Sequence, residues 1–106
     1  MIELKHDISP ELYNLFLENF GTSTAMMLDI AYCESNLRHF NADGTVLMGR
    51  KTADVGILQI SIKHWDKELK AQGIDYWTLE GNLRAAKYIL DKQGVDAWVC
   101  NKYLRA

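Results

Sequence analysis

The feature that most constrains the fold is a glycine-punctuated stretch, residues 39–60, which interrupts an otherwise helical pattern. Within it, residues 45–48 and 57–60 form two short β-prone pieces, and Asp43-Gly44 is a turn signal. A small antiparallel sheet of two or three short strands is therefore expected in the middle of the chain.

Helical patterns flank this stretch on both sides. The only proline, Pro10, follows Ser9, and this pair predicts an N-cap followed by the first helical position. Two further helices are expected over residues 61–73 and 78–94, because each range starts with Ser or Thr and ends with Gly. The chain has 106 residues, so these elements predict a single domain, residues 1–106, of the α+β class and predominantly helical.

A further helix, beginning after Thr22 or Ser23, carries the residue of greatest chemical interest. Its core-facing stripe is predicted from helical spacing at Met26, Ile30, Cys33 and Leu37. Glu34 continues an apolar line on the same side of this helix. Burial and the helix dipole would both raise the pKa of a carboxyl there, as a general acid requires. The alternative is a helix-end carboxylate paired with Arg38 or Arg50.

The charge balance bears on possible partners. With 12 basic and 14 acidic residues the net charge is -2, which argues against nucleic-acid binding. No apolar run approaches the roughly 20 residues of a membrane span. The first seven residues have neither a basic region nor an apolar one, so they do not predict a signal peptide.

The two cysteines, Cys33 and Cys100, allow several interpretations. They could be two buried thiols, a disulfide, or a nucleophilic Cys33 with His64 as its base. The three histidines and the two cysteines show no short metal-ligand spacing, which argues against zinc. Residues 39–50 match a calcium loop only in part, because position 1 is His39 and position 12, where a bidentate Glu is required, is Arg50. No metal or cofactor is expected.

Several motifs, taken in order, resemble the lytic transglycosylase family (SLT-type, lysozyme-like). They are AYCESNL (31–37), DVGILQI (54–60) and NLRAAKYIL (82–90). Members of that family carry a catalytic Glu followed by Ser at a helix end, then a Gly-x-x-Gln turn, then a helix with an Asn-x-x-x-Ala-x-Tyr pattern. The CES triplet and the ending QGVDAWVC (93–100) are still more similar to the resuscitation-promoting-factor branch. The resemblance covers about three-quarters of the chain.

This resemblance implies a compact lysozyme-like fold and a set of site residues. Glu34 would be the catalytic acid and base, and Cys33 and Cys100 would form a disulfide. Substrate-binding positions would be Gln59, His64, Asp54 and Tyr88. The sequence departs from the family pattern in two places: a Thr common in the promoting factors is His64 here, and an Ala-Tyr-Asn triplet near the C-terminus is absent.

The alternatives for these residues stay open at this point. Gln59 could be a polar residue on an edge strand. Tyr88 and Trp65 could both stack on sugars, or they could belong to the core, as aromatic residues at helical spacing usually do; the core is favoured for Trp65. Turn or cap roles are expected for Asp43 and Asp54.

The activity implied by the resemblance is cleavage of peptidoglycan between N-acetylmuramic acid and N-acetylglucosamine, with a 1,6-anhydro product. Two alternatives remain: a lysozyme-type muramidase that uses water with help from Asp43 or Asp54, and a non-catalytic cell-wall-binding module. The partner would be a glycan strand, and the protein would be a monomer. A disulfide would indicate an oxidising compartment: extracellular, cell wall or periplasm, or a phage particle.

Overall fold

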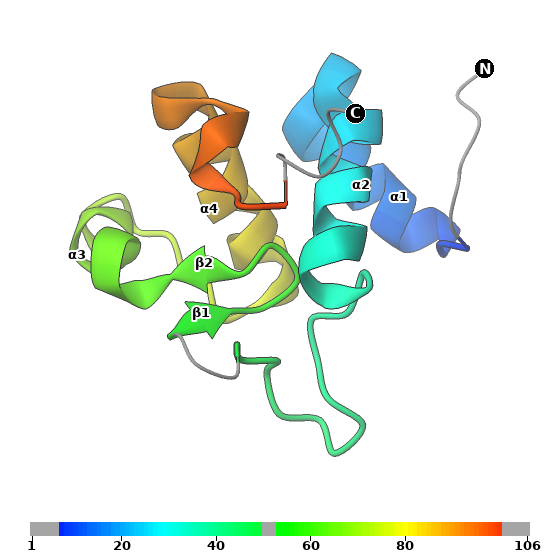
Figure 1. The fold of residues 1–106 in the computed structure, drawn as a ribbon, viewed down its shortest axis with the longest axis horizontal. Coiled ribbons are helices and arrows are strands. Elements are labelled where there is room, and N and C mark those ends of the chain that lie inside the picture. Colours follow the sequence, from blue (N-terminus) through cyan, green and yellow to red (C-terminus); the bar gives the residue numbers. More distant parts are fainter. Residues whose placement is uncertain (1–6, 50–52, 101–106) are drawn as a thin grey trace.

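Helices dominate the structure, a computed structural model that describes residues 7–49 and 53–100 (Figure 1). The elements are α1 (Pro10–Phe20), η1 (Gly21–Ser23), α2 (Thr24–Ser35), β1 (Asp54–Val55), β2 (Ile60–Ser61), α3 (Ile62–Ala71), α4 (Leu79–Gln93) and η2 (Val95–Ala97). This order confirms a mostly helical chain with a small antiparallel sheet. The radius of gyration is 12.9 Å, as expected for a compact chain of this length.

Three helices begin at the residues that the sequence predicts. Ser9 Oγ accepts a hydrogen bond from the backbone N–H of Leu12 at 3.2 Å, which caps α1. Ser61 and Thr78 cap α3 and α4 in the same manner. These bonds satisfy backbone donors that have no partner within the first helical turn.

The start and the buried side of α2 differ from the expectation. Ser23 precedes the helix without making a side-chain capping bond. Met26 and Cys33, assigned to the core stripe, are exposed. The residues that α2 buries are Thr24, Met27, Leu28, Ile30, Ala31 and Ser35. The predicted stripe is therefore right at Ile30, which is buried, and at Leu37, which packs partly buried against the core. It is wrong at Met26 and Cys33, because α2 packs against α1 and also against the turn between the strands.

The sheet is smaller than predicted. Residues 45–48 form only isolated bridges, Phe40 to Val46 and Met48 to Val55. Residues 57–59 form a turn between β1 and β2, not a strand. Gly56 and Gln59 at its two ends have φ values of 78° and 48°, in the left-handed region that a strand cannot contain. The antiparallel pairing is limited to Asp54 with Ser61 and Val55 with Ile60.

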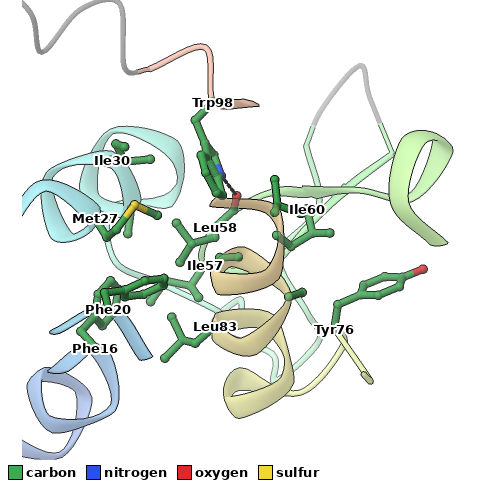
Figure 2. Packing of buried hydrophobic residues seen from close by; sticks show 14 of the residues in the cluster. Phe16, Phe20, Met27, Ile30, Ile57, Leu58, Ile60, Tyr76, Leu83 and Trp98 are labelled. Atoms are coloured by element: carbon green, nitrogen blue, oxygen red, sulfur yellow. Dashed lines mark hydrogen bonds between the residues drawn. The ribbon is translucent and has the colours of Figure 1, made fainter. Parts of the chain in front are cut away.

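A single hydrophobic core joins these elements (Figure 2). Phe16 and Phe20 of α1 pack with their ring centroids 5.5 Å apart. The β1–β2 turn inserts Ile57 and Leu58, both fully buried, between α2 and α4. The core therefore includes the turn itself, although the turn has little regular secondary structure.

Candidate active site

Glu34 lies in the last turn of α2 and is half-buried. It follows Met27 and Ala31 along the helix, and both of those residues are fully buried. The expectation of a carboxyl on the buried side of this helix is therefore confirmed. Directly after α2, Asn36 and Leu37 both adopt left-handed backbone angles, φ 59°, which end the helix abruptly.

The pKa of Glu34 is raised above its usual value. Burial, which disfavours the charged carboxylate, is the largest cause, and the negative charge of Asp54 acts in the same direction. A hydrogen bond from the backbone of Cys100 partly opposes them. Among the described residues no basic side chain pairs with Glu34, Arg38 included. Arg50, the other expected partner, lies outside the described residues.

Two pockets meet at Glu34. The first pocket has a volume of about 630 Å³, and its lining includes Asp54, Ser61, His64, Trp65 and Trp98. The second pocket, about 360 Å³, is lined by Tyr32, Asn36, Arg38, Met48 and others. Glu34 and Gln59 are the two residues that line both. A ligand that spans the two pockets would pass over these two side chains.

Gln59 is oriented by its own turn. Its side-chain Nε2 donates to the carbonyl of Gly56 at 2.8 Å, and its backbone N–H donates to the same carbonyl at 3.0 Å. It is therefore part of the turn and not a polar residue on an edge strand, the alternative considered from the sequence. Among the described residues, its amide oxygen has no hydrogen-bond donor.

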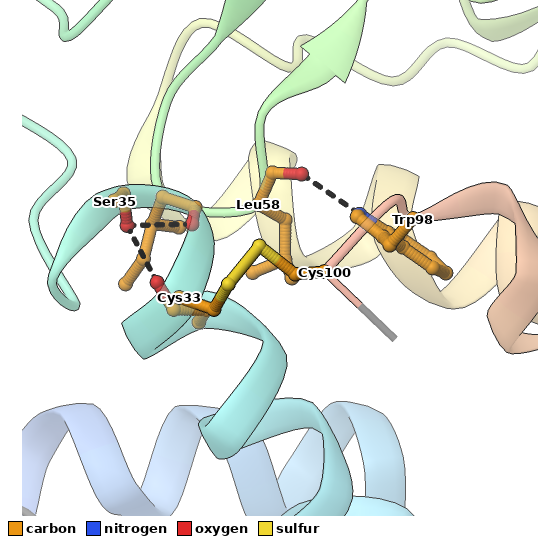
Figure 3. The surroundings of a disulfide bond; sticks show 7 residues. Cys33, Ser35, Leu58, Trp98 and Cys100 are labelled. Carbon is orange, nitrogen blue, oxygen red and sulfur yellow. Dashed lines mark hydrogen bonds between the residues drawn. A yellow bond between two sulfur atoms is a disulfide. The ribbon is translucent and has the colours of Figure 1, made fainter. Parts of the chain in front are cut away.

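Residues 56–59, hereafter the clamped turn, are held by side chains from distant parts of the chain. Ser35 Oγ donates to the Ile57 carbonyl at 2.7 Å, and Trp98 Nε1 donates to the Leu58 carbonyl at 2.8 Å (Figure 3). Both bonds are buried, so losing either one would leave a carbonyl without a partner, at a cost of about 1–3 kcal/mol. Ser35 belongs to the AYCESNL motif and Trp98 to the QGVDAWVC motif. Both side chains act by donating a hydrogen bond to a backbone carbonyl of the clamped turn.

Two further side chains complete the clamp. Asn82, fully buried on α4, accepts from the Leu58 N–H at 3.0 Å and donates to the carbonyls of Val55 and Tyr76. His39 Nδ1 accepts from the Ile57 N–H at 3.1 Å, so its Nε2 carries the proton and donates to the Trp77 carbonyl. The sequence offered no signal for this role of His39, because the partners lie 18 and 38 residues away.

Glycine is required at position 56 by these neighbours. A Cβ added there would lie 2.5 Å from the amide nitrogen of Asn82 and 2.5 Å from a ring carbon of His39. Neither atom can withdraw without giving up a buried hydrogen bond. The glycine of the Gly-x-x-Gln pattern is thus explained by the close approach of two side chains as well as by its positive φ.

A disulfide joins Cys33 to Cys100, with Cα atoms 6.0 Å apart (Figure 3). This confirms the pairing that the resemblance implies. Both cysteines of the chain are used, so the nucleophilic-thiol alternative is excluded. The bridge fixes the C-terminal segment beside α2, where residues 97–99 line the first pocket and the Cys100 backbone bonds Glu34.

The remaining predicted site residues divide into two groups. Asp54, in β1, and His64, exposed in the first turn of α3, line the first pocket. Asp54 lies at the start of a strand and not in a turn, where it had been expected. Tyr88 is not among the residues that line either pocket, and its ring lies 5.2 Å from Lys92 Nζ.

Asp43 and Trp65 fit the structural alternatives considered for them. Asp43 accepts hydrogen bonds from both the backbone and the hydroxyl of Thr45, as expected for a turn residue, and lines neither pocket. Trp65 is partly buried against the core, and it also lines the first pocket.

Comparison of the chain with protein families, with curated proteins and with solved structures finds no match. Within residues 7–49 and 53–100, no three residues of metal-ligating type lie close enough to hold an ion. No helix in the same ranges is long and apolar enough to cross a membrane. The site is thus defined by its own geometry: a half-buried carboxyl with a raised pKa at the junction of two pockets.

Proposed function

We propose that this protein is a lytic transglycosylase with a lysozyme-like fold, and that it cleaves the β-1,4 bond between N-acetylmuramic acid and N-acetylglucosamine. The observation that carries the proposal is Glu34: a half-buried carboxyl with a raised pKa, between two pockets, facing a turn that ends in Gln59. A polymer lying across both pockets would present a glycosidic bond at this junction. The motif resemblance supplies the reaction class.

Glu34 has the properties of a general acid. A carboxyl that stays protonated closer to neutral pH can donate its proton to a glycosidic oxygen. As the proton reaches the oxygen of the leaving N-acetylglucosamine, the bond to C1 of the muramic residue breaks and positive charge develops at that carbon. Gln59 can offer its amide to an N-acetyl group or a sugar hydroxyl nearby.

The second half of the reaction needs no second carboxylate. The 6-hydroxyl of the same muramic residue attacks C1, and Glu34, now ionised, accepts the hydroxyl proton. The products are a 1,6-anhydro end and a free 4-hydroxyl, and Glu34 returns to its protonated form. The attack is intramolecular, so its effective concentration is high and no water has to be positioned.

Asp54 supports a second candidate, a muramidase that uses water. It lines the first pocket together with Glu34, and its charge raises the pKa of Glu34. Retaining and inverting glycosidases use a second carboxylate in such a place. The two reactions leave different ends on the glycan, so analysis of the products separates them.

The disulfide supports a site of action outside the cytosol, because such bonds persist in oxidising compartments. We place the protein at the cell wall, in the periplasm or on a phage particle, acting as a monomer on glycan strands without a cofactor.

Replacement of Glu34 tests whether the domain is an enzyme or a non-catalytic wall-binding module. Glu34→Gln keeps the side-chain shape and removes the transferable proton. We expect release of fragments from purified peptidoglycan to fall at least about 100-fold, as for loss of a general acid. Glu18→Gln, on the exposed side of α1, is the matched control and should be fully active. No activity in the parent chain, or full activity in Glu34→Gln, would overturn the proposal.

A further inference from the structure

The two pockets that meet at Glu34 differ in charge. The first pocket contains residues of both signs, Asp54 and Lys63, together with the imidazole of His64. In the second pocket, Arg38 is the one charged side chain besides Glu34 among the lining residues that the structure describes. Its other lining residues are neutral: Tyr32, Cys33, Ser35, Asn36, Leu47, Met48, Gly49 and Gln59. The second pocket thus offers a cation to a ligand.

Arg38 is held in place by its backbone, although its side chain is exposed. Its N–H donates to the carbonyl of Ser35 at 3.2 Å, which fixes it against the end of α2. The next residue, His39, is buried and bonded through both ring nitrogens. The guanidinium therefore projects from a rigid point, although Arg38 lies outside any helix or strand.

The guanidinium also has no ion-pair partner within the part of the chain that the structure describes. An arginine offers several N–H donors in a planar fork, which matches the two oxygens of a carboxylate. An arginine with a fixed backbone, in a pocket beside Glu34, therefore suits recognition of an anionic group on the substrate.

We propose that the second pocket binds a carboxylate substituent of the glycan through Arg38, and that this contact makes the protein select muramic-acid-containing strands over neutral glycans. This inference rests on the proposed function. In that substrate, carboxylates occur on the lactyl ether of the muramic residue or on the peptide attached to it. N-Acetylglucosamine polymers have neither.

The proposal gives Arg38 a role in specificity and not in the chemical step. Glu34 serves any β-1,4 glycan equally, whereas Arg38 distinguishes glycans by charge. Because the side chain is exposed, salt should screen the contact, and preference for the anionic glycan should decline as ionic strength rises.

A binding experiment tests this without interference from turnover. Glu34→Gln protein is titrated with three oligosaccharides of equal length: a muramic-acid oligomer with free lactyl carboxylates, the same oligomer carrying peptides, and chitotetraose, which has no carboxylate. Each titration is repeated with a protein that carries Arg38→Gln in addition to Glu34→Gln. Arg84→Gln, an exposed arginine on α4 that lines neither pocket, is the matched control.

We expect Arg38→Gln to weaken binding of a carboxylate-bearing ligand about tenfold and to leave chitotetraose unchanged. The ligand that shows the loss, lactyl or peptide, identifies the source of the carboxylate. Equal affinities with and without Arg38, or an equal loss for chitotetraose, would overturn the inference alone. If no glycan binds even with Arg38 present, the proposed function fails instead.

Discussion

The helices and the clamped turn are stabilised in different ways. The helices are held by burial of large apolar side chains such as Phe16, Ile30 and Leu83. The clamped turn, residues 56–59, also buries Ile57 and Leu58, but in addition its backbone is hydrogen-bonded by the side chains of Ser35, His39, Asn82 and Trp98. Apolar burial tolerates exchange of one hydrophobic residue for another. The turn needs particular donors and acceptors, and it carries Gln59 to the junction of the two pockets.

The largest effect is expected at the disulfide, which ties the segment that carries one of the clamping residues, Trp98, to α2. The Cys33–Cys100 bridge closes 67 residues. Replacing both cysteines with serine should cost about 4 kcal/mol of unfolding free energy in the chain-entropy model. Activity should also fall, because residues 97–99 line the first pocket. Urea unfolding followed by circular dichroism measures the first effect; a cost below about 1 kcal/mol would mean the bridge contributes little.

A smaller but still large effect is expected at Gly56. In Gly56→Ala the new Cβ meets both His39 and Asn82, and the residue has a positive φ, so the cost should be about 3 kcal/mol or more. Gly73→Ala is the matched control: it also has a positive φ, but nothing lies within 4 Å of the added atom. Its cost should be about 1 kcal/mol. Equal losses in thermal unfolding would show that the close approach is unimportant.

Trp98→Phe tests one hydrogen bond of the clamp. It keeps an aromatic ring in the core and removes the donor to the Leu58 carbonyl, so the expected cost is about 2 kcal/mol. Trp77→Phe, on a tryptophan that is 42% exposed, should change stability by less than about 0.5 kcal/mol. If the two variants unfold at the same denaturant concentration, the clamp bond is not stabilising the turn.

The smallest effect concerns Glu34 and depends on pH. A carboxyl whose pKa is raised in the folded state binds its proton more tightly there, so the protein loses stability as pH rises from about the unfolded pKa through the folded one. Glu34→Gln lacks this loss. The variant should therefore match the parent at pH 4 and be more stable at pH 7. A parent chain that gains stability relative to Glu34→Gln as pH rises would contradict the raised pKa.

The helix starts could be predicted from the sequence and the clamped turn could not, because their hydrogen bonds span different distances along the chain. The caps at Ser9, Ser61 and Thr78 act on backbone groups three residues away, so local pattern is enough to place these helix starts. The clamped turn was assigned to a strand because its partners are far along the chain. Ser35 lies 22 residues from Ile57, and Trp98 lies 40 residues from Leu58.

In the site, the helical spacing of apolar residues pointed to Glu34. The resemblance to the transglycosylase family pointed to Gln59 and to the pairing of Cys33 with Cys100. Asp54 and His64 do line the first pocket, but Tyr88 lines neither pocket. The spacing of Tyr88 along α4 shows which residues share its side of the helix, but it does not show which side faces a pocket. The sequence indicates Arg38 only as an ion-pair partner for Glu34. Its place in the second pocket depends on the left-handed turn at Asn36 and Leu37, which spacing along a helix does not predict.

The products of the reaction show most directly whether Glu34 works with an intramolecular nucleophile. Purified peptidoglycan is digested with the parent chain and the soluble fragments are analysed by mass spectrometry. The account predicts muramic residues with 1,6-anhydro ends, each lighter by one water than the hydrolysis product and resistant to borohydride reduction. Reducing ends in their place would contradict it and assign the reaction to water, with Asp54 as the second carboxylate.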